Sequence, residues 1–308
     1  MISISESFSK SSIEQHTHAT TLISKENMEH ILVPINFTPA TEISLAHAIG
    51  IAQASHKIVI LCHFITSTIP LGANAVLHKR EIKEKHEKAY MEMRVLLAQY
   101  ENYTYNGTGQ PVMIEPLVME GHPDDATGKI MQDNSIAMIV LSHKDSNEIK
   151  DLFLNNKVVR EANCPILTIP EDATYKPLEY VVYAANFDGN DATRIRDLIE
   201  LTSNFDAKLD CLHVCTDGKK LREENEKMQE LQAEFDVVLF SKLSFKVLRD
   251  SKSVTSGLEN YLSNHTPDIL VMLKTEKTFF KKLFGSKESI RKMALDNGMP
   301  IMIYREPK

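Results

Sequence analysis

The sequence predicts an α/β protein made of two tandem doubly wound domains, each a five-stranded, mainly parallel sheet with helices on both faces. Short apolar runs alternate with helical patterns along the chain, and the second half of the sequence repeats the first. The length of 308 residues agrees, since roughly 100–200 residues make one domain. The chain is therefore expected to fold as two similar units.

The repeat is clearest around two Asn-Phe pairs. Residues 30–64 and 180–214 each begin with an apolar run, continue through Asn-Phe into a helical pattern, and end in a second apolar run that contains a histidine. Asn36 and Asn186 are 150 residues apart, and the two segments align without a gap. A repeat of this kind indicates a duplicated domain.

Four segments are expected from this duplication. They are an N-terminal extension at 1–28, a first domain at 29–170, a linker at 171–178 and a second domain at 179–308. The extension is rich in Ser and Thr and has no sustained apolar period, which favours a flexible tail over a docking or phosphorylation segment. It also lacks the basic start and apolar stretch of a secretory signal, so the cytoplasm is the expected location.

In the first half, residues 31–35 and 58–64 are typical of buried strands because they are short runs of Ile, Val and Leu. Between them, Thr38 can cap a helix that has Pro39 at its first position. Residues 76–100 predict a long, charged amphipathic helix. Further strands are expected at 112–119, 136–141 and 165–169, with a last helix before the closing strand.

The second half follows the same order. Asp188 or Asn190 can cap its first helix, in which apolar residues recur at helical spacing. Residues 218–235 predict the charged helix, and strands are expected at 243–249, 268–273 and 300–304. Alternation of this kind makes a parallel sheet covered by helices, with ligand sites at the carboxyl ends of the strands.

The composition excludes several classes of protein. A formal net charge of −7 argues against nucleic acid or an acidic membrane as the main partner. No apolar run approaches the ~18–20 residues of a membrane span. Four cysteines are too few for a disulfide scaffold in a chain of this length.

Several stretches together resemble the universal stress protein family, in its tandem two-domain form. They are HILVPINFTPATEISLAHAIGIAQ, EGHPDDATGKIMQDNSIAMIVLSHK and VVREANCPILTIP in the first half, and DILVMLKTEKTFFKKLFGSKESIRKMALDNGMPIMIY in the second. The resemblance covers almost everything from Met28 to Arg305. It implies a nucleotide-binding-like α/β sandwich with five parallel strands per domain, and a role in stress response.

Many members of that family hold ATP phosphates with Gly-x-x-Gly, followed about nine residues later by Gly-Ser or Gly-Thr, because only glycine lets the backbone approach an anion closely. The matching stretch of the first half, 141–158, contains no glycine. Ser142 and Asp145 stand where the first two glycines would be. The first half is therefore not expected to hold ATP in the family's usual way.

The second half keeps part of the motif. Leu273 and Glu276 replace the first two glycines, but Gly285 and Ser286 remain, just before a helical pattern that begins near Lys287. Basic residues surround this pair, at Lys277, Lys281, Lys282, Lys287, Arg291 and Lys292. Two interpretations stay open: an anion site at a helix start, and a solvated basic face, which the weakness of a lone Gly-Ser favours.

Three further positions bear on a nucleotide. The resemblance places Asn36 and Asn186 where the family has an acid that contacts adenine; asparagine can hydrogen bond to a base or cap a turn. Gly121 falls in a loop whose backbone normally approaches ribose or phosphate in the family, although a glycine also simply makes a turn. Asn36 and Gly121 are weak candidates in the first half, whereas Asn186 joins Gly285, Ser286 and Lys287 as the nucleotide or anion candidate of the second half.

No metal or catalytic site is expected. Cys211, His213 and Cys215 share one face of a predicted strand, but zinc needs about four ligands and no fourth is evident. His63 and His213 occupy equivalent strand ends, where a structural role is preferred. No nucleophile elbow, His-Glu-x-x-His motif or complete phosphate loop is present.

The leading hypothesis is a cytoplasmic, non-catalytic binding or signalling module of the stress response that acts through protein partners, without a cofactor. The two halves are expected to pack as an internal pseudo-dimer, and a further homodimer of chains stays open. The alternative is an adenine-nucleotide sensor that binds ATP or AMP, with slow hydrolysis at most, through Asn186, Gly285, Ser286 and Lys287.

Overall fold

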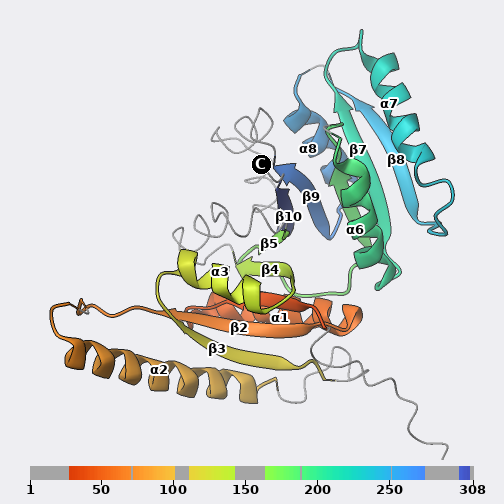
Figure 1. The fold of residues 1–308 in the computed structure, drawn as a ribbon. Helices are drawn as coiled ribbons and strands as arrows, with labels where there is room; N and C mark the ends of the chain where they lie inside the picture. The colour runs from red at the N-terminus through yellow and green to blue at the C-terminus, as the bar shows by residue number, and fades with distance from the viewer. Residues whose placement is uncertain are drawn as a thin grey trace, which may run out of the picture.

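The structure is a computed structural model that describes residues 28–70, 72–100, 111–142, 164–187, 189–250, 252–274 and 298–305. These residues form one ten-stranded sheet (Figure 1). Its strands are β1 (His30–Pro34), β2 (Ile58–Ile65), β3 (Ile114–Glu120), β4 (Ile136–Ser142), β5 (Ile166–Ile169), β6 (Tyr180–Ala184), β7 (Lys208–Cys215), β8 (Leu243–Arg249), β9 (Ile269–Lys274) and β10 (Ile301–Arg305).

The strand order is β3-β2-β1-β4-β5-β10-β9-β6-β7-β8, so the first half and the second half have the same internal order. Within each half, neighbouring strands are parallel. The halves meet where β5 pairs with β10 in antiparallel register, with Ile303 opposite Ile166 (Figure 1). The predicted α/β fold class is confirmed, and the two five-stranded sets share a single sheet.

Helices cover both faces of this sheet. They are α1 (Pro39–Ser55), α2 (Ala75–Ala98), α3 (Pro123–Asp133), α6 (Asp191–Ser203), α7 (Leu221–Ala233) and α8 (Val254–His265). One core cluster joins α1, α2, α6 and α7 to the same face, while α3 and α8 pack on the other face in two smaller clusters. Ile31 and Val33 of β1 enter the large cluster and Leu32 enters a small one, as alternation along a strand requires.

Two predicted helix caps work differently in the structure. Pro39 begins α1 as expected, but Thr38 makes no capping bond; its Oγ1 donates to Asn36 Oδ1 at 2.8 Å. Asn190 likewise precedes α6 without a side-chain cap. Asp191 closes that turn instead, because its Oδ2 accepts the Phe187 backbone N–H at 2.8 Å.

The charged helices differ from their predicted bounds at the ends. α2 covers the predicted segment to within two residues. α7 begins at Leu221 and not at residue 218, because the Lys220 N–H bonds to Asp217 O at 2.9 Å in a turn. The last helices predicted in each half, the alternative cap Asp188 and residues 1–27 of the N-terminal extension lie outside the described residues.

The predicted linker lies against the first half. The ring of Tyr175 rests on Gly50 of α1, where a Cβ atom would lie 1.9 Å from Tyr175 Cζ. The ring also meets His47 edge-on, with centroids 5.5 Å apart. Leu178, at the end of the linker, is buried in the large core cluster. These contacts hold the segment before β6 against the first half.

Candidate functional site

A cleft of about 520 Å³ opens at the carboxyl ends of β1 and β2, where the sequence places the ligand site. Asn36, His63, Lys85, Lys88 and Glu92 supply its polar side chains. The strand ends provide the first two residues, and α2 provides the two lysines and the glutamate.

The Asn-Phe turn has the same unusual backbone in both halves. Phe37 has φ +58° and Phe187 has φ +61°, in the left-handed region that side chains other than glycine seldom adopt. Each ring packs on the strand-end histidine of its half, with centroids 4.7 Å apart for Phe37 and His63, and 4.1 Å apart for Phe187 and His213.

The backbone holds each of these histidines. His63 Nδ1 lies 2.8 Å from Ile35 O, and His213 Nδ1 lies 3.0 Å from Ala185 O. In the second half, His213 Nε2 also lies 3.3 Å from Glu224 Oε2 of α7. Together with the ring contacts, these bonds give both histidines a defined structural position at the strand end.

In the first half, an acid of α2 binds the neighbouring loop. Glu81 accepts hydrogen bonds from Ser67 Oγ at 2.5 Å and from Thr68 Oγ1 at 3.0 Å. Lys85 pairs with the same carboxylate at 2.8 Å and donates to Thr66 O at 2.8 Å. The bond from Lys85, followed by those from the loop, lowers the pKa of Glu81. Lys85 is therefore already engaged by the protein.

The other ionic and polar groups of the cleft also have partners. Lys88 Nζ lies 3.7 Å from Glu92 Oε1, and Asn36 Oδ1 accepts the Thr38 hydroxyl. A triphosphate entering this cleft would have to compete with these contacts for each cation. Within the part of the chain that the structure describes, both lysines of this cleft are thus paired with acids of α2.

Two further predicted positions take part in turns beside strand ends. Gly121 follows β3 with φ +120°, which requires glycine, and its N–H donates to Ile65 O at 2.9 Å. Asn186 precedes the left-handed Phe187, at the place that Asn36 has in the first half. Gly285, Ser286, Lys287 and the surrounding basic residues lie outside the described residues.

The cysteines on the strands are buried thiols. Cys62, Cys211 and Cys215 are at most 1% exposed. Burial raises the pKa of all three, so they stay protonated at neutral pH. Within the described ranges, His, Cys, Asp and Glu side chains form no group of three or more that could hold a metal ion.

Sequence reasoning missed two acids that the fold uses. Asp191 joins the Asn-Phe turn to the sheet, since its Oδ1 accepts the Tyr183 hydroxyl at 2.5 Å while Oδ2 holds Phe187 N. Asp210 of β7 is fully buried among hydroxyl and ammonium donors. An acid inside an otherwise apolar strand run was the available signal for the second.

Residues 27–170 match the universal stress protein family. Residues 27–170 therefore form a domain of this family. No curated protein matches the sequence. Among the residues that the structure describes, no helix combines the length and the apolar character needed to cross a membrane.

Solved structures extend the likeness over the whole chain. A universal stress protein from Archaeoglobus fulgidus DSM 4304 is 12% identical, with a TM-score of 0.60 over 90% of this chain and 96% of that one. The cytoplasmic domain of a prokaryotic cation chloride cotransporter is 10% identical, with a TM-score of 0.50 over 91% and 96%. At these identities the likeness is one of fold. The universal stress protein fold thus extends through both halves.

Proposed function

We propose that this universal stress protein is a tandem, two-domain member that acts in stress response as a non-catalytic binding or signalling module. It would work in the cytoplasm through protein partners, with no cofactor. The repeated strand order and the antiparallel pairing of β5 with β10 support an internal pseudo-dimer. Family membership supports the stress-response role.

The observation that carries the proposal is the paired state of the strand-end cleft. Lys85 is held by Glu81 and by Thr66 O, and Asn36 by Thr38. The Phe37 ring covers one side of His63. A nucleotide would have to break contacts that the protein makes with itself, and the chain lacks the phosphate-binding glycines in this half.

The alternative is an adenine-nucleotide sensor that uses the second half, with ATP or AMP at Asn186, Gly285, Ser286 and Lys287. The observation in its favour is the basic sequence around Gly285 and Ser286. Cations beside a helix start would attract a phosphate.

The first prediction separates these two functions. Protein purified without nucleotide is denatured and its released small molecules are chromatographed, and the intact chain is titrated calorimetrically with ATP, ADP and AMP. We expect no released nucleotide and no binding heat. A micromolar response that disappears in the Lys281→Ala, Lys282→Ala double variant would replace the proposal with the sensor function.

A further inference from the structure

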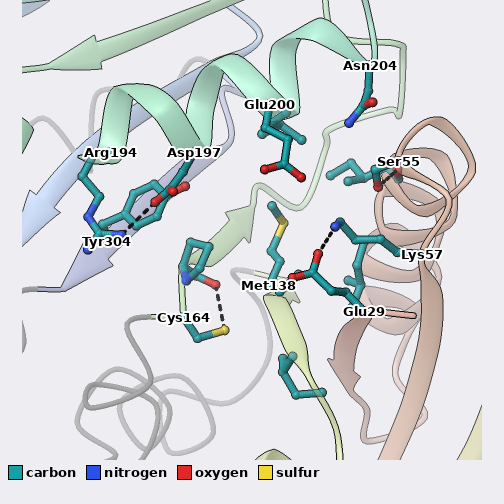
Figure 2. Close-up of a pocket in the computed structure, with 16 residues that line it drawn as sticks. Glu29, Ser55, Lys57, Met138, Cys164, Arg194, Asp197, Glu200, Asn204 and Tyr304 are labelled. Carbon is teal, nitrogen blue, oxygen red and sulfur yellow. Dashed lines mark hydrogen bonds and ion pairs between the residues drawn. The ribbon is translucent and has the colours of Figure 1, made fainter. Parts of the chain in front are cut away.

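A second cavity, of about 300 Å³, lies between the two halves and away from the strand-end cleft (Figure 2). Helix α6 forms one wall, where Arg194, Asp197 and Glu200 follow one another at intervals of three residues. Glu29 and Lys57 of the first half face them. The volume is at the lower end of the range for small-molecule sites, roughly 300 Å³ and upward.

Arg194 is a buried cation with few acceptors. It is 4% exposed, its Nη1 donates to Asp197 Oδ2 at 2.9 Å, and its guanidinium carbon lies 4.8 Å from the ring centroid of Tyr304. Its Nε is buried and has no hydrogen-bond partner among the described residues. A guanidinium has five N–H donors, and buried donors normally find acceptors. The Arg194 guanidinium therefore has an unfilled hydrogen-bond donor beside this wall of the cavity.

Glu200 adds an exposed carboxylate to the same wall. Figure 2 shows its carboxylate pointing from α6 into the cavity, and it makes no ion pair within the described part of the chain. Lys57, across the cavity, already pairs with Glu29. Burial raises the pKa of Asp197, with Glu200 adding to that rise and Arg194 opposing it. The cavity has one carboxylate more than it has cations.

Apolar side chains form part of the lining of the same cavity, among them Ile51, Met138 and Leu201. Ile51 and Met138 are buried in the large core cluster. A ligand that fits would therefore carry an apolar group together with its charges.

We propose that this cavity binds a small zwitterion of the α-amino-acid type with an apolar side chain. The ligand carboxylate would meet Arg194, the ammonium would meet Glu200, and the side chain would lie against Ile51, Met138 and Leu201. A simple anion would face the surplus negative charge, and a simple amine would leave Arg194 without its acceptor. This site is separate from the strand-end cleft and does not depend on the function proposed for it.

The test is calorimetric titration of the full chain with L-leucine and two analogues of the same skeleton. The amine 3-methylbutan-1-amine lacks the carboxylate, and 4-methylpentanoate lacks the ammonium. We expect L-leucine to bind and each analogue to bind about tenfold more weakly or not at all, because each loses one charge-assisted hydrogen bond. No heat from L-leucine at millimolar concentration, or equal affinity for all three compounds, would overturn the proposal.

Two variants test whether L-leucine binds in this cavity. Glu200 is exposed, so Glu200→Gln should fold normally. It is expected to weaken L-leucine about tenfold but not to weaken 4-methylpentanoate, whose carboxylate then meets less negative charge. The matched control is Glu230→Gln, at an exposed position of α7, which should bind L-leucine like the wild type. Unchanged leucine affinity in Glu200→Gln would place the ligand elsewhere and contradict the assignment.

Discussion

Replacing Asp210 with alanine is expected to lower the free energy of unfolding by about 2–3 kcal/mol, because hydroxyl donors would lose a buried, charged acceptor. Asp210 Oδ2 accepts the hydroxyls of Tyr180 at 2.7 Å and Tyr261 at 2.6 Å, and the ammonium of Lys246 at 2.9 Å. Its Oδ1 accepts Ser244 Oγ at 2.5 Å. Lys208 Nζ also donates to Oδ2, at 3.0 Å, so alanine would leave five donors without this acceptor. Urea unfolding followed by circular dichroism measures the loss.

The same carboxylate makes stability depend on pH. Burial raises the pKa of Asp210, but the hydrogen bonds from Ser244, Tyr261, Lys246 and Tyr180 together outweigh it and hold the pKa below its usual range. In the unfolded chain an aspartate titrates near pH ~3.9. The contribution of the ionised group is therefore complete above that pH and is lost as the pH falls below it.

Two variants complete this experiment. Asp210→Asn keeps the shape but cannot ionise, so its stability should fall less than that of the wild type between pH 7 and pH values below ~4. Asp236→Asn, at an exposed position, should behave like the wild type at both. If Asp210→Ala were as stable as Asp236→Asn, the network would not carry the stability assigned to it.

Replacing Gly50 with alanine is expected to destabilise the protein by about 1–3 kcal/mol, the usual cost of overpacking. A Cβ there would lie 1.9, 2.2 and 2.4 Å from Cζ, Cε1 and Oη of Tyr175. The ring would have to leave α1, and the linker with it. At an open helical position the same change would stabilise the protein by about 0.5–1 kcal/mol. A loss of stability would therefore indicate that Tyr175 packs against Gly50.

A double-mutant cycle tests the cause. In a Tyr175→Ala background the obstruction is gone, so Gly50→Ala should then be neutral or slightly stabilising. Gly72→Ala is the surface control, since a Cβ there would meet nothing within 4 Å. A rise in the thermal midpoint of Gly50→Ala with Tyr175 in place would contradict the packing of the linker on α1.

Local patterns predicted most of the elements well. The strand expected at 243–249 is β8 with the same bounds, and the run expected at 58–64 is β2 with one residue added. Short runs of branched apolar residues predict buried strands, because each such strand is covered on both faces of the sheet. The cap at Thr38 failed because its hydroxyl turned to Asn36. Whether the hydroxyl accepts a backbone N–H of the helix or donates to a nearby side chain is not visible in residue types.

The candidate sites were harder to predict from the sequence than the helices and strands. Asn36 and Gly121 were placed near the strand ends by the resemblance, but the engagement of Lys85 by Glu81 and by Thr66 O depends on how α2 lies against β2. The cavity beside Arg194 brings together side chains from both halves of the chain. Contacts between residues so far apart in sequence leave no periodic signal in either segment.

The sequence by itself determined the fold class, the strand-and-helix order and the likeness of the two halves around Asn36 and Asn186. These follow from hydrophobic spacing and turn residues, which act over a few neighbouring positions. Only the tertiary structure decided that β5 and β10 join the halves into one sheet, which donors surround Asp210, and that Arg194 Nε has no hydrogen-bond partner among the described residues. Those outcomes depend on packing between distant segments, where the geometry of the whole chain selects each partner.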